Sequence, residues 1–360
     1  MDNFSEPTAG PQRQGDREPR PRKSFLRRHA MTFVVVTLVV AAAAVGALMY
    51  VFRGHDGEAA WFYLPRNATA EAVADSLRAA LGESEGQRVY NLWQLQGGDV
   101  AKAHGAYRVD EGQSALRTAR RMATGAQTPV RLTFNNIRTL PQLAERIGRT
   151  MECTPDNFTA AVKDVLDAEG YKEAEYVAAF LPDTYEMYWT SDASAIVKRL
   201  MKYRDDFWTD ERTSRAKALG LTPVQVATLA SIVEEESNKT DEHPKIARLY
   251  LNRLNRGMRL QADPTVKFAT GDFTLRRIRG RHLSINSPYN TYLRPGLPPG
   301  PIRVADGRAI DAVLNAPDAD YLYMCARPDF SGYHDFATDY QTHRVNARRY
   351  QAALNARSIK

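Results

Sequence analysis

The longest apolar run of the chain, Met31–Phe52, lies near its start and consists mostly of Val, Ala and Leu without a charged residue. A helix needs about 20 such residues to cross the hydrocarbon core of a bilayer. We therefore expect a single membrane-spanning helix at 31–52. A cleaved signal peptide is the alternative, although its apolar region is usually shorter, about 7–15 residues. Residues 1–30 are rich in Pro, Arg, Gln and Gly, which predicts a disordered tail.

After this run, strand-like segments and amphipathic helical patterns follow one another. WFYLP (61–65) predicts a strand, and the strand-then-helix pattern recurs up to residue 150, so we expect a small α/β subdomain at 53–150. Residues 151–360 are mainly helical in pattern. Within them, FLPDTYEMYWTSDAS (180–194) is expected to be a turn, and Tyr321–Ala326 should form a hairpin with Gly332–Phe336. The predicted fold class is α+β.

One helix, starting after Thr222, ends in three consecutive carboxylates. Thr222 is placed to cap it, Pro223 suits its first position, and Gln225 completes a capping box. The apolar stretch VATLASIV then gives way to Glu234, Glu235 and Glu236. A carboxylate at the end of an apolar helix is either a solvated helix end or a catalytic acid. Helical periodicity does not choose between Glu234 and Glu236.

Two segments rich in hydrogen-bonding groups follow this helix. The first is NRLNRGMRLQADPTV (252–266), which contains Gln261 and Asp263, and the second is SPYNTYLRPGLPPGPI (287–302). Five prolines in the second segment fix backbone angles before folding and predict a stiff loop. With Tyr289, Asn290 and Tyr292, this loop suits a polar, ring-shaped ligand such as a sugar. A purely structural turn is the alternative, and Asp263 can also simply cap a turn before Pro264.

The charge distribution gives little support for nucleic-acid binding. The net charge is +7, but residues 1–30 contribute +3 of it and 53–360 only +4. No interleaving of aromatic and basic residues, as in single-strand binders, is present. Basic residues before the apolar run outnumber those after it, which places the N-terminus in the cytoplasm and 53–360 outside. Cys153 and Cys325 are too few for a disulfide framework and are expected to be buried free thiols.

Several enzyme classes lack their motifs in this chain. There is no HExxH and no closely spaced histidine pair, no phosphate-binding or dinucleotide-binding glycine-rich turn, and no GxSxG elbow. We therefore expect neither a metal nor another cofactor. His334 is interpreted as a surface or packed histidine, with substrate contact as the alternative.

Five ordered blocks resemble the MltG/YceG-like endolytic murein transglycosylases. They are FLPDTYEMY (180–188), LASIVEEES (229–237), NRLNRGMRLQADPTV (252–266), SPYNTYLRPGLPPGPI (287–302) and YLYMCARPDFSGYHDF (321–336). The resemblance covers roughly residues 60–350. It implies a single-pass protein of the cytoplasmic membrane whose periplasmic part cleaves peptidoglycan strands internally. It also implies a LysM-like subdomain at 53–150 and a catalytic domain at 151–360, with cell-wall synthases as further partners.

The resemblance also implies roles for individual residues. Glu234 matches the family's catalytic acid, which protonates the glycosidic oxygen and then accepts the proton of the attacking 6-hydroxyl, leaving a 1,6-anhydro sugar. The substrate-binding residues implied are Glu236, Gln261, Asp263, Tyr289, Asn290 and Tyr292. Two alternatives stay open: a muramidase that hydrolyses the bond with a second carboxylate, and a non-catalytic, membrane-tethered scaffold that binds glycan.

Overall fold

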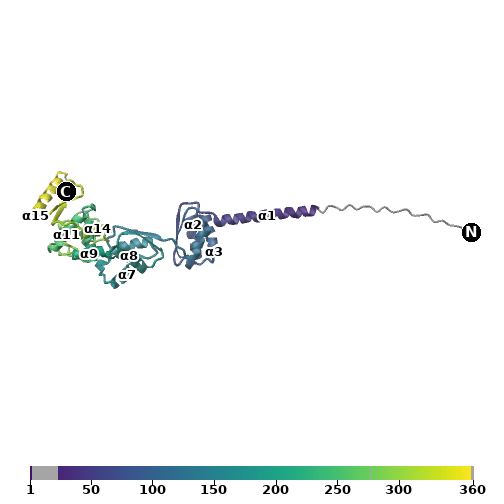
Figure 1. Ribbon diagram of the computed structural model, residues 1–360, viewed down its shortest axis with the longest axis horizontal. Helices are drawn as coiled ribbons and strands as arrows, with labels where there is room; N and C mark the ends of the chain where they lie inside the picture. The colour runs from purple at the N-terminus through teal and green to yellow at the C-terminus, as the bar shows by residue number, and fades with distance from the viewer. Residues whose placement is uncertain (2–22, 276, 358–360) are drawn as a thin grey trace.

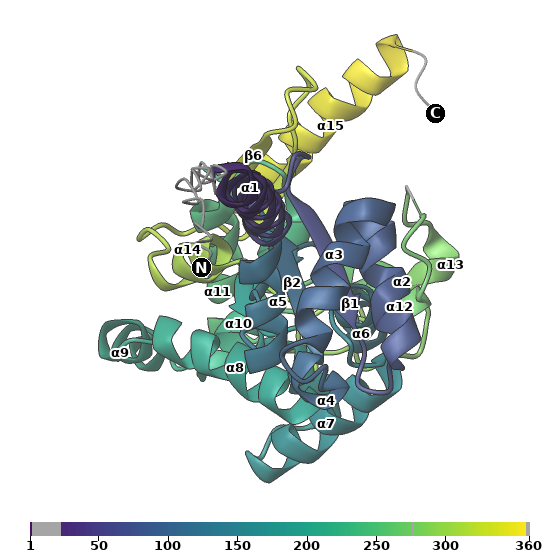
Figure 2. The ribbon, with the colours of Figure 1, turned by 90° about the vertical axis from the view of Figure 1, so that its right-hand side faces the viewer.

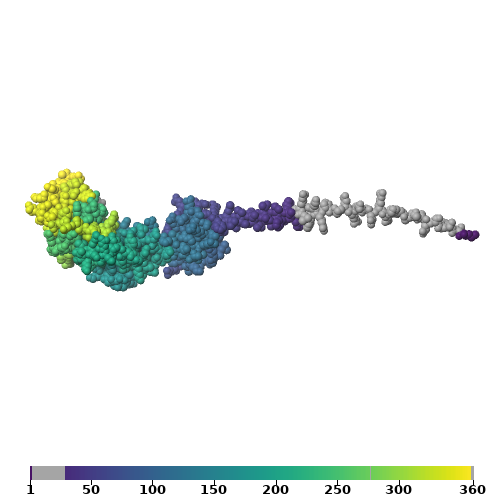
Figure 3. All heavy atoms as spheres, viewed as in Figure 1, coloured from purple at the N-terminus to yellow at the C-terminus, as the bar shows by residue number. Residues whose placement is uncertain are grey.

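The computed structural model describes Met1 and residues 23–275 and 277–357. The described chain is elongated: a long helix leads into three lobes that follow one another in chain order (Figures 1 and 3). Each lobe has its own hydrophobic core. We call them the N-terminal lobe (53–128), the middle lobe (130–208) and the C-terminal lobe (209–356).

Helix α1 (Lys23–Phe52) projects from the N-terminal lobe (Figure 1). It begins eight residues before the predicted span, so residues 23–30 are helical and the prediction that they are disordered is wrong. Residues 2–22 of the predicted tail lie outside the described residues. Within α1, His29–Phe52 is long and apolar enough to cross a membrane, and its apolar window is not buried in the protein. This supports the predicted membrane span; a signal sequence near the N-terminus meets the same criteria.

The N-terminal lobe packs helices against one face of a two-stranded antiparallel sheet (Figure 2). The predicted strand at 61–65 is confirmed, and Thr69 caps the next helix by accepting a hydrogen bond from the Ala72 amide (3.2 Å). Trp93 and Tyr107 are the largest side chains of its core. The elements are β1 (Ala60–Leu64), α2 (Ala70–Leu81), α3 (Glu83–Gln94), α4 (Val100–Ala103), β2 (Gly105–Val109) and α5 (Ala115–Thr124).

The middle lobe contains a second two-stranded antiparallel sheet. One of its strands, β4, lies in the segment that we expected to be a turn. Tyr185 and Met187 alternate with exposed residues there, and the Tyr185 ring stacks on Phe134 of the paired strand at 5.5 Å, so burial of one face favours a strand. The elements are β3 (Val130–Phe134), α6 (Leu140–Thr150), α7 (Pro155–Ala168), the 3₁₀-helix η1 (Glu173–Ala179), β4 (Asp183–Met187) and α8 (Ala193–Phe207).

The C-terminal lobe is a group of helices followed by a hairpin and a final helix (Figure 1). The predicted hairpin is confirmed, with Tyr323 paired to Ala337 and Ala326 to His334. The elements are α9 (Asp210–Ala218), α10 (Pro223–Glu236), α11 (His243–Asn255), α12 (Asp263–Thr270), α13 (Gly280–Leu283), α14 (Gly307–Leu314), β5 (Tyr323–Ala326), β6 (His334–Ala337) and α15 (Tyr340–Ala356).

The α+β class is confirmed, with small antiparallel sheets and a majority of helices. Val130 and Leu132 of β3 share a core with Phe158 and Leu200 of the later helices, so the middle-lobe core extends across residue 150. The domain boundary at 150 and the LysM-like nature of 53–150 stay predictions. Both cysteines are free, as expected, but each is partly exposed rather than buried.

Candidate active site

Helix α10 brings three carboxylates to one end of the C-terminal lobe. The predicted capping box is confirmed: the Thr222 hydroxyl accepts from the Gln225 amide at 3.2 Å, and the Gln225 side chain accepts from the Thr222 amide at 2.9 Å. Side chains from Val226 to Val233 are buried on every face of the helix, so its position is fixed by packing. The Ser231 hydroxyl also accepts from the Ile302 amide at 3.0 Å, which ties the proline-rich loop to α10.

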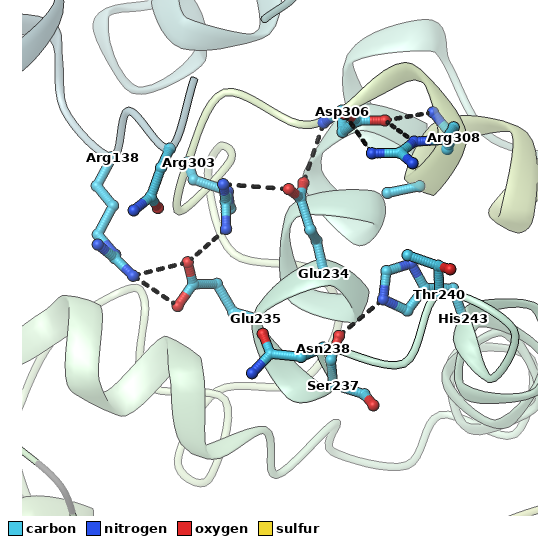
Figure 4. A pocket seen from close by; sticks show the side chains of 12 residues that line it. Arg138, Glu234, Glu235, Ser237, Asn238, Thr240, His243, Arg303, Asp306 and Arg308 are labelled. Atoms are coloured by element: carbon cyan, nitrogen blue, oxygen red, sulfur yellow. Dashed lines mark hydrogen bonds and ion pairs between the residues drawn. The ribbon is translucent and has the colours of Figure 1, made fainter. Parts of the chain in front are cut away.

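Glu234 and Glu235 face a charged pocket and are both ion-paired (Figure 4). Arg303 lies 3.1 Å from the Glu234 carboxylate and 2.8 Å from that of Glu235. Arg138 of the middle lobe donates to both Glu235 oxygens, at 2.9 and 3.1 Å, and the Asp306 amide donates to Glu234 at 3.0 Å. Burial raises the pKa of Glu234, and Arg303 opposes this rise by stabilising the ionised form.

Glu236 points into a different environment. Its carboxylate accepts a hydrogen bond from the Tyr250 hydroxyl at 2.5 Å, and it forms no ion pair with any residue that the structure describes. Burial raises the pKa of Glu236 to about 7; the Tyr250 hydrogen bond opposes this rise, and the charge of Asp263 adds to it. A carboxyl group with a pKa near neutrality can both donate and accept a proton under physiological conditions.

The surface around Glu236 is a cleft made of two adjoining hollows. One, of about 210 Å³, is lined by Tyr250, Gln261 and Tyr292 among others, and the second, of about 370 Å³, lies toward α12. Glu236 and Asp263 line both hollows. The cleft therefore extends to two sides of these carboxyl groups.

Four of the predicted substrate-binding residues meet in this cleft: Glu236, Gln261, Asp263 and Tyr292. Asp263 does not cap a turn, because its carboxylate accepts from the Tyr292 hydroxyl at 2.6 Å and it starts α12 instead. Gln261 is held at a positive φ of 53°, a conformation that is rare outside glycine, and Arg253 donates to its side chain at 3.3 Å.

Tyr289 and Asn290, the other two predicted substrate-binding residues, are not brought to the cleft. Asn290 is fully buried, and its side-chain amide donates to the carbonyls of Leu283 and Ile285, both at 2.9 Å. The Tyr289 ring packs on Phe268 at 4.7 Å. Both residues therefore stabilise the proline-rich loop itself. For these two residues, the structure favours the alternative of a purely structural turn.

Sequence reasoning missed Tyr250 and Arg253 as site residues. Tyr250 lies outside the segments singled out from the sequence, and Arg253 belongs to the segment 252–266 without a role of its own, because their positions on α11 carry no chemical signal. Arg253 donates to the Leu322 and Leu260 carbonyls, each at 2.7 Å, and so joins the hairpin to the Gln261 segment.

His334 lies at the rim of the same cleft and is half-buried rather than fully packed. Its Nδ1 is 3.0 Å from the buried Glu242 carboxylate, and its backbone amide donates to the same group at 2.9 Å. These contacts fix the orientation of the ring.

Comparisons with known proteins agree with this architecture. The chain is 34 % identical over 174 residues to the endolytic murein transglycosylase of Bacillus subtilis (strain 168), covering 48 % of this chain and 45 % of that protein. It is 29 % identical over 214 residues to the endolytic murein transglycosylase of Streptococcus pneumoniae serotype 2 (strain D39 / NCTC 7466), covering 52 % and 39 %. The chain thus spans less than half the length of these two relatives.

A crystal structure of a YceG-like protein from Listeria monocytogenes has the same fold, with a TM-score of 0.54 and 23 % identity. The similarity covers 80 % of this chain and 98 % of that one. Residues 62–349 match the YceG-like family, which is most of the three lobes. The chain therefore belongs to the YceG-like family.

Proposed function

We propose that this protein is a membrane-anchored lytic transglycosylase that cuts peptidoglycan strands internally, with Glu236 as its catalytic acid and base. The observation that carries the proposal is a carboxyl group, without an ion pair among the described residues, that lines a cleft together with Gln261, Asp263 and Tyr292; burial raises its pKa to about 7. A cleft that continues on both sides of the acid suits a polymer cut away from its ends. The activity named for the two relatives supports the same reaction class.

The reaction needs only one carboxyl group. Protonated Glu236 donates its proton to the glycosidic oxygen as the bond to the anomeric carbon breaks. The 6-hydroxyl of the same sugar then attacks that carbon and gives its proton to the Glu236 carboxylate. A 1,6-anhydro sugar is released on one side, a free hydroxyl on the other, and no water is consumed.

The neighbouring side chains have distinct roles in this proposal. Asp263, held by Tyr292, provides negative charge where positive charge develops on the sugar. Burial raises the pKa of Glu236, and the charge of Asp263 adds to this rise. Gln261 hydrogen-bonds the substrate from its fixed position beside Arg253.

We prefer Glu236 to Glu234, the residue that the family resemblance suggested. Burial raises the pKa of both carboxyl groups, but Glu234 also forms an ion pair with a guanidinium 3.1 Å away, which opposes the rise, whereas Glu236 forms no ion pair with a described residue. Gln261, Asp263 and Tyr292 also line the Glu236 cleft and not the Glu234 pocket. In this proposal the ion pairs of Glu234 and Glu235 stabilise the helix end that presents Glu236.

Hydrolysis is the second candidate, because Asp263 lines the cleft together with Glu236 and provides a second carboxylate. A periplasmic location and an association with cell-wall synthases belong to the proposal as well. They rest on the apolar part of α1 and on the family resemblance.

Product analysis distinguishes the two reactions. Purified peptidoglycan is digested with residues 53–360, and the chain ends are analysed by mass spectrometry. Ends lighter by one water molecule than the ordinary reducing sugar are expected and identify a transglycosylase. Ordinary reducing ends would establish hydrolysis instead, and undigested strands with a folded protein would favour the non-catalytic scaffold.

The hydrogen bond from Tyr250 leads to a prediction about pH dependence. It stabilises the ionised form of Glu236, so Tyr250→Phe should raise the pKa of Glu236. Activity requires the protonated acid and falls as pH rises through this pKa. The alkaline limb of the kcat/KM profile should therefore move up by about one pH unit in the variant. Tyr188→Phe, at an exposed position in the middle lobe, is the matched control. An unchanged limb, or one at lower pH, would contradict the role of Glu236.

A further inference from the structure

His334 has one ring nitrogen for which the mechanism described so far has no use. The residue lies at the start of β6, opposite Ala326 of β5, and lines the hollow of about 210 Å³ together with Glu236. Its Nδ1 contacts Glu242, whereas Nε2 has no hydrogen-bond partner among the described residues and is not one of their buried, unpartnered polar atoms. Nε2 is therefore accessible to a ligand that fills the hollow.

Glu242 decides which ring nitrogen of His334 carries the proton. Only 4 % of Glu242 is exposed, and one of its carboxylate oxygens accepts from the His334 backbone amide at 2.9 Å. The other oxygen lies 3.0 Å from Nδ1 and accepts from the Ser237 hydroxyl at 3.4 Å. An ionised carboxylate only accepts hydrogen bonds, so Nδ1 is the donor. In the neutral ring, Nε2 therefore presents a lone pair.

The position of Nε2 is fixed from two sides. Glu242 directly precedes α11, whereas His334 lies in the hairpin, so their contact joins segments that are 92 positions apart. Within the hairpin, the pairing with Ala326 holds the backbone, and Arg327 donates to the His334 carbonyl at 3.3 Å. A ligand that hydrogen-bonds to this ring need not bear the cost of ordering the side chain.

A neutral nitrogen lone pair selects ligand groups that donate hydrogen bonds. Hydroxyl and amide N–H groups can bind to it, whereas a carboxylate offers only acceptors. The donor groups of Tyr250, Tyr292 and Arg253, which line the same hollow, are already bound to acceptors of the protein. Nε2 of His334 thus offers the hollow an acceptor that no described residue occupies.

We infer that His334 is a further substrate-binding residue, whose Nε2 accepts a hydrogen bond from an O–H or N–H group of the sugar next to the cleaved bond. His334 and Glu236 line the same small hollow, so a group that reaches Nε2 belongs to a sugar close to the acid and not to the end of a peptide stem. The contact orients that sugar relative to Glu236. The inference rests on the proposed function for its ligand, whereas the His334–Glu242 geometry does not depend on it.

Two substitutions separate the two ring nitrogens of His334. In His334→Asn, the side-chain amide reaches the position of Nδ1 and keeps a donor for Glu242, but no atom occupies the position of Nε2. In His334→Gln, the amide extends to the position of Nε2 and provides an acceptor there, while the donor for Glu242 is lost. The first variant removes the substrate contact, and the second replaces it.

The test measures binding with the full chain carrying Glu236→Gln, so that strands stay intact. The probes are soluble glycan strands with peptide stems and the same strands with their stems removed. His334→Asn should weaken binding of both probes about tenfold, which corresponds to about 1.4 kcal/mol, and leave thermal unfolding near that of the parent chain. His334→Gln should bind more tightly than His334→Asn but unfold at a lower temperature. A merely structural histidine would give the opposite order of affinities.

Asp335→Asn, one position along β6, is the matched control. Successive side chains of a strand point to opposite faces, and Asp335 pairs with Arg327 at 3.3 Å and lines neither hollow. Strand binding by this variant should be unchanged. Unaltered affinity in His334→Asn would overturn the inference, and weaker binding only of strands with stems would overturn the assignment of the donor to a sugar.

Product analysis of the wild-type chain separates these results from failure of the proposed function. Anhydro ends together with unaltered binding by His334→Asn would reject the His334 contact only. Weaker binding by His334→Asn without anhydro ends from the wild-type chain would retain the contact and reject the reaction.

Discussion

Glu236→Gln is expected to lower the rate of strand cleavage by about 10²–10⁴-fold, the usual contribution of a general acid. Glutamine retains the shape of the side chain and its contact with Tyr250 but has no proton to donate to the glycosidic oxygen. The measurement is release of anhydro ends from purified peptidoglycan. Glu234→Gln is the matched variant two residues earlier on the same helix. It should retain much more activity, because it loses an ion pair with Arg303 rather than the acid. A larger loss of activity in Glu234→Gln than in Glu236→Gln would instead identify Glu234 as the catalytic residue.

Glu236→Gln should also change the free energy of unfolding in a pH-dependent way. Measuring this change distinguishes a loss of activity from a loss of folding. The pKa of Glu236 is about 7 in the folded chain against an ordinary 4.5, so ionisation is more costly after folding. The contribution of the carboxyl group to stability is most favourable below pH 4.5, declines as pH rises to about 7, and is constant above that. Glu236→Gln should therefore raise the free energy of unfolding by about 1–3 kcal/mol above neutrality, with little effect in acid.

Gly300→Ala is expected to destabilise the protein by about 3 kcal/mol, near the upper end for an overpacked site. Gly300 is buried at the end of the proline-rich loop, and an added Cβ would overlap the backbone carbonyl of Ala174 in η1. A backbone neighbour cannot move aside as a flexible side chain can. Relief requires the loop, which carries Tyr292, to shift away from the middle lobe. Thermal unfolding should show a decrease of about 6–12 °C, and cleavage should fall as the Tyr292–Asp263 contact is displaced.

Gly280→Ala is the control for this substitution. It is exposed in the same lobe, and an added Cβ would have no heavy atom within 4 Å. Its stability should stay near that of the wild type. Equal stability of the two variants would mean that the close approach of Gly300 to η1 does not constrain the loop.

The helices and their starts could be predicted from the sequence because their signals are local. Thr222 accepts a hydrogen bond from the backbone amide three residues later, and this cap was identified from residue type and position alone. Strand β4 could not be predicted, because it needs Phe134 of a distant strand to bury Tyr185.

The candidate site was predicted in part, for a similar reason. The motifs singled out Gln261, Asp263 and Tyr292, and the structure brings these three residues into one cleft with Glu236 of α10. The choice between Glu234 and Glu236 depends on where Arg303 and Tyr250 lie, and both come from other segments of the chain. Asn290 has a side chain suited to sugar binding, but its burial, which the sequence does not reveal, commits its amide to the backbone.

The ion pair between Arg138 and Glu235 has a genetic consequence. A helix that ends in three carboxylates is unfavourable, because its C-terminus already carries partial negative charge. Part of the compensating charge comes from a residue 97 positions earlier in another lobe. Loss-of-function substitutions at Arg138 would therefore map to the middle lobe, away from the catalytic cleft in the sequence, although they act on the C-terminal end of α10. Second-site suppressors should arise at Glu235 by neutral substitution, because this removes a charge that has lost one of its two arginine partners, with Arg303 remaining as the other.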